Sequence, residues 1–450
     1  MEPVRPGPPS LRSSSWRFGL FTLLYLYQGV VAGFALTALA NHFAAAGTSA
    51  TDIGRHLAIV GLPWVLQPLL WGPVIDRASP YSMGPRRYWL VLSLAFAQAC
   101  LASLLLLGEA PSLTTVSAVL FLHSMAASLA DTATDRMIAD SVPDDELGRT
   151  SAGTRAGFVI GSAAGAAIFA WLLAGKGLPV AAGVLCALTT SLALTAILVR
   201  ETPGDRFLSP HRAASTRAPG RGRASEMISF ARRLLAAFRT RDATILLTMC
   251  FAIDFGLALF QVPFTVALVQ VHGWTAGDLS RLQAGLALLG GTLGAAGLGA
   301  AVDRVGPRRA LRTLLFACAV ALGAAGALIG AGLEATAGPF IIGLTSVVPA
   351  LLYVALLPTV LLASRAGHAS ATQFQVYMAA MNLGDVVGSA LAGTLAAVMA
   401  PTLVAFGVAI LFLVCTRSVP TPGHRPASAN GLQRPMLGRR SLRGTDTSEG

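Results

Sequence analysis

Long apolar runs constrain this chain more than any other feature. About a dozen such runs follow one another with short polar or basic connections between them, and each approaches the roughly 20 residues that a helix needs to cross a bilayer. With 54% hydrophobic and only 12% charged residues, the chain has too little polar material to cover a water-soluble globule. The sequence therefore predicts an all-α membrane protein with twelve transmembrane helices, near residues 17–40, 52–74, 88–107, 112–138, 150–174, 179–199, 242–270, 277–300, 309–331, 337–363, 370–399 and 401–417.

The first apolar run raises the question of a cleavable signal peptide, because "ALA" at 38–40 is a small-residue cleavage pattern. The run is longer than the apolar region of a signal peptide, and it contains Tyr25, Tyr27 and Gln28. We interpret it as a retained transmembrane helix.

Basic residues occur in alternate connections. They lie in the first tail, after the second and eighth spans, in the long middle segment and in the last tail, whereas the other connections carry almost none apart from Lys176. Because basic loops stay in the cytoplasm and the number of spans is even, we expect both termini in the cytoplasm and the protein in the bacterial inner membrane. The net charge of +12 is then explained without nucleic acid as a partner.

A change of composition in the middle divides the chain into two halves of six spans each. Residues 200–241 are rich in Arg, Pro, Gly and Ser, and their later part places apolar and basic residues on opposite sides of a helix, as in helices that lie on an anionic membrane surface. We expect a cytoplasmic tail at 1–16, a six-helix bundle at 17–199, this basic linker at 200–241, a second six-helix bundle at 242–417 and a disordered cytoplasmic tail at 418–450.

The two halves carry related sequences at corresponding loops. After the second span the chain reads "GPVIDR", followed after an insertion by "GPRR", and after the eighth it reads "GAAVDRVGPRR". Such an internal repeat is typical of transporters built from two related bundles. The pattern resembles the G-x-x-x-D-R-x-G-R-R signature of the major facilitator superfamily, from which the second copy departs only at Pro307.

The resemblance implies two six-helix bundles and a gating role for this loop. In that family the signature cluster ties the bundles together on the cytoplasmic side and breaks during alternating access. Its glycines let a neighbouring helix approach closely, and its aspartates can accept hydrogen bonds from a helix N-terminus. A basic loop that only fixes topology is the simpler alternative. The residues concerned are Gly72, Asp76, Arg77, Arg86 and Arg87 in the first copy and Gly299, Asp303, Arg304, Gly306, Arg308 and Arg309 in the second.

Two further elements resemble one branch of that superfamily, which includes muropeptide permeases (AmpG), siderophore importers and acetyl-CoA transporters. "DTATD" at 131–135 matches the Asp-x-Ala-x-Asp element of that branch in the fourth helix, and "SATQF" at 370–374 matches its Ser-x-Thr-Gln-[Tyr/Phe] element entering the eleventh. Arg136 replaces the small residue expected after the second Asp. The resemblance implies import of a muropeptide- or siderophore-like solute.

The fourth span carries two charged pairs. Asp131 and Asp135 lie one turn apart on one helix face, and Arg136 and Asp140 form a second pair rotated by about 100°. A charge at membrane depth costs on the order of 3 kcal/mol, so it usually faces a wet cavity or a partner. Because neighbouring carboxylates resist ionising together, we predict that the Asp131–Asp135 pair binds protons, unless Arg136 or Arg155 neutralises it permanently. The Arg136–Asp140 pair is expected near the cytoplasmic mouth, as a gate or as a structural salt bridge.

Other polar residues within the spans are candidates for the transport pathway. The resemblance implies that spans one, four, seven and ten line the cavity, which favours Gln28, Asp131 and Asp254. We expect Asp385 to serve helix packing or to support the residues of the site. Glycines at 157, 161 and 165 predict a close-packed seam in the fifth span. The remaining candidates are Tyr25, Arg155, Gln261, Thr372, Gln373 and Asn382.

These features predict a monomeric secondary transporter that works by alternating access, with a small-molecule solute and protons as its partners. A drug or metabolite exporter of the same fold and a non-transporting sensor are the alternatives. Neither H-E-x-x-H nor G-x-S-x-G occurs, which argues against an enzyme, and no G-x-x-x-x-G-K-[ST] loop supports ATP coupling. The five cysteines lack C-x-x-C spacing, so we expect no disulfide, metal site or cofactor.

Overall fold

The chain is helical almost throughout the residues that the structure, a computed structural model, describes: 8–76, 81–108, 110–143, 145–211, 232, 238–365 and 370–419. Within these residues, ten helices are long and apolar enough to cross a membrane. An isolated parallel β-bridge between Ser10 and Arg200 ties the segment before the first helix to the segment after the sixth span.

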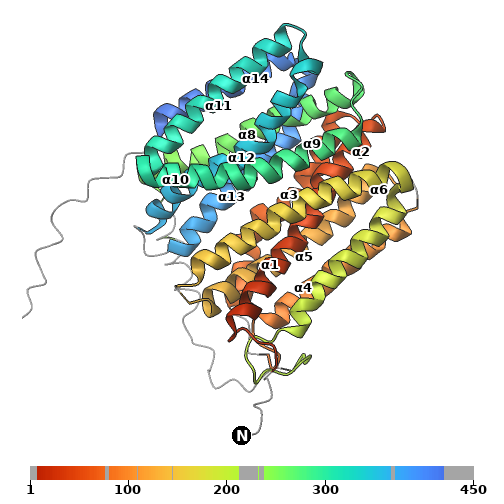
Figure 1. Cartoon of the computed structure of the whole chain (residues 1–450), viewed down its shortest axis with the longest axis vertical. Coiled ribbons are helices and arrows are strands. Elements are labelled where there is room, and N and C mark those ends of the chain that lie inside the picture. Colours follow the sequence, from red (N-terminus) through yellow and green to blue (C-terminus); the bar gives the residue numbers. More distant parts are fainter. Residues whose placement is uncertain are drawn as a thin grey trace, which may run out of the picture.

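The N-terminal half, coloured red to yellow-green in Figure 1, supplies the first six spans. Its first span runs without a break from Ser14 to Ala45, which is longer than the predicted 17–40, and it contains a π-helical stretch. The elements are α1 (Ser14–Ala32), the π-helix η1 (Gly33–Ala38), α2 (Leu39–Ala45), α3 (Ala50–Asp76), α4 (Arg87–Ser103), the short 3-10 helix η2 (Leu104–Leu106), α5 (Leu113–Ser141) and α6 (Leu147–Leu198).

Helix α6 is two transmembrane spans. Its 52 residues would measure roughly 78 Å if straight, more than twice the ~30 Å core of a bilayer. Gly177 leaves the helical conformation with φ 76° and ψ 177°, and Pro179 follows it. The two arms turn back beside each other in Figure 1. The predicted break between the spans at 150–174 and 179–199 is therefore confirmed.

The C-terminal half, coloured green to blue, supplies the other six spans. The eighth span consists of two helices joined by a π-helical stretch at consecutive glycines. When it is added and α6 is counted twice, the ten long helices become the twelve predicted spans in the described part of the chain. The elements are α8 (Arg241–Gln270), α9 (Ala276–Leu289), η3 (Gly290–Gly294), α10 (Ala295–Val305), α11 (Pro307–Gly330), α12 (Glu334–Arg365), α13 (Ser370–Val398) and α14 (Pro401–Ser418).

Glycines let α1 and α6 pack backbone against backbone. A Cβ atom added at Gly157, Gly161 or Gly165 would lie within 2.5 Å of a backbone oxygen of α1. Conversely, a Cβ atom at Gly29 or Gly33 would lie within 2.2 Å of a backbone oxygen of α6. Real Cβ atoms cannot approach so closely, so the predicted glycine seam is confirmed and α1 contributes to it as well.

The internal repeat is visible in the backbone. Gly84 and Gly306 precede α4 and α11 with φ angles of +104° and +86°, which side-chain-bearing residues rarely adopt. The carbonyl of each glycine accepts a hydrogen bond from the amide four residues later, that of Tyr88 or of Ala310. The two "GPRR" segments therefore share the positive-φ glycine and its hydrogen bond, although α11 begins at Pro307 directly after the glycine and α4 begins at Arg87.

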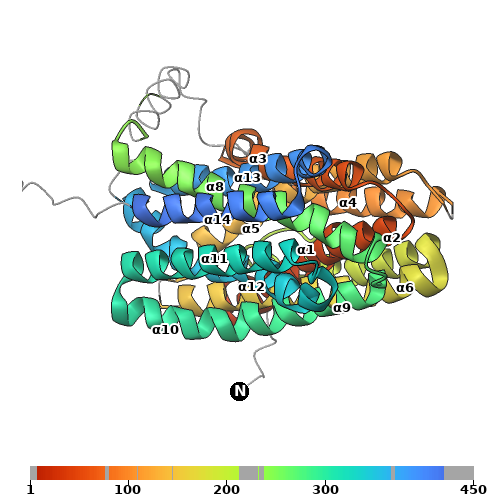
Figure 2. The same ribbon diagram turned by 90° about the horizontal axis from the view of Figure 1, so that it is seen from above.

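The two halves contact each other chiefly at one end. We call this the far end, formed by residues 46–49, 271–275 and 331–333, and we call the opposite end, with residues 81–86 and 142–146, the basic end. Ala40, Ala44 and Ile53 of the N-terminal half belong to the hydrophobic core of the C-terminal half. Helix α2 lies against α8 and α9, α3 against α13, and α6 against α9 (Figures 1 and 2).

Several predicted segments lie outside the described residues. They are residues 1–7 of the first tail, residues 212–231 and 233–237 with most of the predicted membrane-surface helix, and residues 420–450 of the predicted disordered tail.

Candidate transport site

Asp131 and Asp135 point from α5 toward α1 and α3, where neutral side chains hold them. Asp131 accepts hydrogen bonds from the amide Nε2 atoms of Gln28 (2.8 Å) and Gln67 (2.7 Å), one on each carboxylate oxygen. Asp135 accepts a hydrogen bond from the Tyr25 hydroxyl at 2.6 Å. Asp131 is only 9% exposed, and Asp135 is half-buried, so the pair lies within the N-terminal bundle.

No cation neutralises this carboxylate pair in the described part of the chain. Arg136 instead pairs with Asp140 at 3.3 Å. The guanidinium of Arg155 lies over the ring of Tyr353, 5.0 Å from its centre, which is a contact between the two halves. Two buried carboxylates with neutral partners are costly while charged, and a bound proton removes much of that cost.

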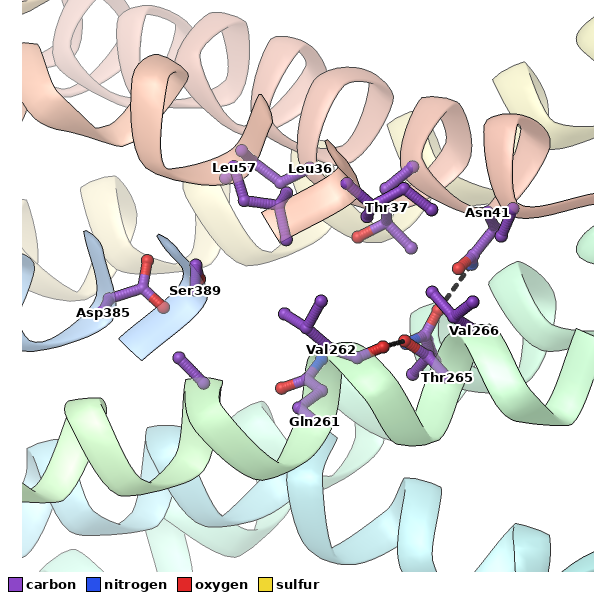
Figure 3. A pocket seen from close by; sticks show the side chains of 15 residues that line it. Leu36, Thr37, Asn41, Leu57, Gln261, Val262, Thr265, Val266, Asp385 and Ser389 are labelled. Atoms are coloured by element: carbon purple, nitrogen blue, oxygen red, sulfur yellow. Dashed lines mark hydrogen bonds between the residues drawn. The ribbon is translucent and has the colours of Figure 1, made fainter. Parts of the chain in front are cut away.

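Two adjoining cavities lie between the bundles, and they share Leu36 and Asp385 in their walls. The larger measures about 270 Å³ and has Gln28, Trp64, Phe158 and Asn382 among its lining residues. The smaller, shown in Figure 3, measures about 190 Å³. Its polar lining residues are Thr37, Asn41, Gln261, Thr265, Gln283, Asp385 and Ser389.

Three aspartates lie differently from the expectation with respect to the two cavities in this conformation. Asp385, expected to serve helix packing or to support the residues of the site, lines both cavities, whereas Asp254 and Asp131, expected to line the cavity, are absent from the walls of both. Gln28 stands between Asp131 and the larger cavity, because it lines that cavity and donates to Asp131. Asp385 rather than Asp254 lines the cavities because Gly384 packs on the backbone of α8. This contact leaves the adjacent Asp385 to face the bundle interface.

Cross-bundle hydrogen bonds seal the cavities on the far-end side. Asn41 of α2 donates from Nδ2 to Ser280 Oγ (2.9 Å) and to Gln283 Oε1 (2.8 Å) in α9. Gln270 of α8 donates to the carbonyls of Ala44 and Thr48 at 2.9 Å each. These contacts close the far end in this conformation.

Arg87 of the first signature copy, predicted to act in gating, makes its contacts within the N-terminal half in this conformation. It is 0% exposed, and its guanidinium donates to the carbonyls of Ala196 (3.0 Å) and Ile197 at the end of α6. In return, the Glu201 carboxylate accepts from the backbone amides of Arg86 (3.0 Å) and Arg87 (3.1 Å). Burial raises the pKa of Glu201 above its ordinary value, although these two amides act in the opposite direction. The loop thus joins the start of α4 to the end of α6.

Two other predictions for the first copy have different outcomes. A Cβ atom added at Gly72 would meet nothing within 4 Å, so the expected close helix approach is absent there in this conformation. At the basic end, Asp140 binds Arg136 and also Arg86, whose Nη2 lies 3.5 Å from its carboxylate. All three residues belong to the N-terminal half, so this cluster does not join the bundles in this conformation.

The remaining predicted residues are only partly described. In the second signature copy, Arg304 and Arg309 are exposed and Arg308 is half-buried, and Gln373 is buried in α13. Arg77, the surroundings of Gly299 and the side chains of Asp76, Asp303 and Thr372 lie outside the described part.

Sequence reasoning missed Gln67, Asn41, Trp64 and Tyr353. Gln67 could have been found, since an amide within an apolar span is the same signal that singled out Gln28. Asn41 lay just beyond the predicted end of the first span. Trp64 and Tyr353 carry no signal that separates them from ordinary aromatic residues in transmembrane helices.

Two pseudo-equivalent six-helix bundles around a central polar cavity define a membrane transporter. A family comparison agrees, because the Major Facilitator Superfamily model matches residues 18–376. The chain belongs to the Major Facilitator Superfamily.

Among solved structures, the fold is similar to the crystal structure of the nucleoside transporter NupG, with a TM-score of 0.63 at 14% identity, covering 90% of this chain and 98% of that one. A single-substitution variant of the same transporter gives a TM-score of 0.60 with the same identity and coverage. No curated protein matches the sequence.

Proposed function

We propose that this protein is a proton-coupled importer of a small solute in the bacterial inner membrane, with Asp131 and Asp135 as the proton-binding pair. The observation that carries the proposal is that these two carboxylates, one buried and one half-buried, have only neutral hydrogen-bond partners among the described residues. If the two carboxylates served only to stabilise the fold in their charged form, an arginine partner would stabilise that charge more than neutral amides do.

Gln28 supplies a physical link between this pair and the solute. Its amide donates to Asp131 and also lines the larger cavity. When Asp131 binds a proton, its carboxyl group becomes a donor and a poorer acceptor, so the Gln28 amide can exchange this partner for a solute. Proton binding and solute binding then influence each other, which is what coupling requires.

The basic loops support the orientation. If they lie in the cytoplasm, both termini are cytoplasmic and the far end, closed by Asn41 and Gln270, faces the periplasm. Import then requires these contacts to break and the basic ends to approach each other, by rocking of two bundles within one monomer.

Three solute classes have support of different kinds. The elements at 131–135 and 370–374 favour a muropeptide- or siderophore-like compound, whereas the fold similarity to NupG brings nucleosides into consideration. The cavities lie at or below the low end of the roughly 300–1,000 Å³ usual for small-molecule sites, which favours the smaller members of these classes.

Uptake into proteoliposomes tests this function. Muropeptides, siderophores, nucleosides and common drugs are presented with and without an inward proton gradient, to wild type and to Asp131→Asn and Asp135→Asn variants. We expect the gradient to accelerate uptake by wild type at least tenfold and to have little effect on either variant.

Asp278→Asn is the matched control, because Asp278 is exposed at the far end and pairs only with neighbouring Arg281 and Thr275. It should respond like wild type. An equal gradient response in all proteins would exclude these aspartates as the coupling site. Gradient-driven efflux would identify an exporter, and no movement of any solute would favour a sensor.

A further inference from the structure

Among the described residues that line the two cavities, Asp385 is the only Asp, Glu, Lys or Arg. Its side chain is exposed to the cavity space, and Figure 3 shows it on the cavity wall with Ser389 one turn away. None of the described residues forms a hydrogen bond or an ion pair with it. The carboxylate is therefore available to a ligand in the place where the two cavities meet.

The negative charge of Asp385 has no compensating cation among the described residues. Gly384 and Gly388 of α13 pack against α8 so closely that added Cβ atoms would lie 2.1 and 2.5 Å from the carbonyl oxygens of Phe251 and Phe255. This contact turns the glycines of α13 toward α8 and leaves Asp385 on the side of the helix that lines the cavities. A carboxylate without a compensating partner on the cavity wall creates a negative potential in the cavity, which favours a cation and disfavours an anion.

Side chains around Asp385 add acceptors on one side and apolar surface on the other. Asn382 lies about one turn before Asp385 on α13 and lines the larger cavity, and Ser389 lies about one turn after it and lines the smaller cavity. The amide of Asn382 donates weakly to the Trp64 carbonyl at 3.4 Å, which leaves its own carbonyl oxygen free to accept. Trp64 and Phe158 provide aromatic surface in the same cavity.

We propose that Asp385 binds the positive group of the transported solute, and that the solute is a small organic cation: a protonated amine attached to an apolar or aromatic group. An ammonium has three donors and no acceptor, so it can bind the Asp385 carboxylate and also donate to the oxygen of Asn382 in the larger cavity. The aromatic part fits beside Trp64 and Phe158. This inference rests on the proposed transport function and names the solute class of the same site.

The first measurement is equilibrium binding to the purified full-length protein in nanodiscs, at fixed pH and without any gradient. The probes are a panel of small amines, each matched to a neutral alcohol and to a carboxylate of the same shape, together with uncharged nucleosides. Thermal stabilisation identifies binders, and titration gives their Kd. We expect amines to bind and their alcohol and carboxylate counterparts to bind at least tenfold more weakly.

Three variants separate ligand recognition from other roles. Asp385→Asn should weaken amine binding by about 10- to 100-fold and abolish the preference over the neutral alcohol. Asp385→Glu should retain that preference, and the distant control Asp278→Asn should bind like wild type. If Asp385→Asn fails to fold, the comparison of Asp385→Glu with the charge-matched probes still reports on the carboxylate.

Several outcomes would overturn the inference. These are a panel without any amine binder, binders that are all neutral or anionic, or an amine whose Kd is the same in Asp385→Asn. Loss of the proton-gradient response in Asp385→Asn with unchanged affinity would make Asp385 a proton site instead. Failure of the proposed function can be told apart from failure of this inference. The Asp131→Asn and Asp135→Asn variants should still bind the amine at fixed pH but should lose its gradient-driven uptake.

Discussion

At the scale of single residues, the same sequence pattern serves two different purposes in the two halves. Arg87 and Arg309 are the last residues of the two "GPRR" segments, and both segments begin their helices from a glycine with positive φ. Arg87 is buried and binds the end of α6, whereas Arg309 is exposed. The guanidinium of Arg87 can satisfy several carbonyls at once because its donors form a rigid fork.

Replacing Arg87 by lysine should therefore destabilise the protein. Lysine retains the charge but cannot reach the Ala196 and Ile197 carbonyls together, so buried acceptors lose their donors. We expect a loss of about 2–4 kcal/mol in the free energy of unfolding, measured as a lower Tm of the purified protein. The matched Arg309→Lys variant should change Tm little, and equal effects of the two substitutions would contradict the different roles.

The chemistry of individual residues was only partly predictable from the sequence. The Arg136–Asp140 contact follows from helical spacing alone, because both residues lie on α5. The cavity position of Asp385 does not, since it depends on which face of α13 meets α8. Likewise, the internal repeat that singled out Arg87 does not predict that residues 200–206 contact this arginine.

At the scale of elements, the α1–α6 seam shows what glycine spacing can predict. Four-residue spacing places Gly157, Gly161 and Gly165 on one side of α6, and small residues on one face of a transmembrane helix indicate close packing. The spacing did not identify α1 as the neighbour. Hydropathy predicted the spans well for a similar reason, because span length is a property of each segment, whereas the π-helical stretches η1 and η3 left no periodic signal.

Gly161→Ala should weaken this seam. The added Cβ would lie 2.4 Å from the Leu26 carbonyl oxygen and 2.9 Å from the Val30 amide nitrogen, so the two helices must separate. We expect a loss of about 1–3 kcal/mol in stability, read from Tm in detergent. Gly175→Ala is the control in the same helix, because nothing lies within 4 Å of its added Cβ. The close-packing account is wrong if both variants melt alike.

At the scale of the whole molecule, the two bundles have two areas of contact with different chemistry. Toward the far end, amide side chains and apolar residues join them, as Asn41 does with Ser280 and Gln283. Nearer the basic end, Arg155 of one bundle lies over Tyr353 of the other. Alternating access requires the first area to open, and none of these cross-bundle partners could be assigned from the sequence, because they lie more than 190 residues apart in the chain.

A reversible link across the far end should therefore stop transport without preventing solute binding. Asn41→Cys with Ser280→Cys, in a background lacking the five native cysteines, places two thiols where Asn41 Nδ2 and Ser280 Oγ lie 2.9 Å apart. A short bifunctional thiol reagent should abolish uptake in proteoliposomes, and a reductant should restore it. Each single-cysteine variant, treated identically, should keep transporting. Fully cross-linked protein that still accumulates solute would show that the far end need not open, because the solute would then have crossed without the movement that two rocking bundles require.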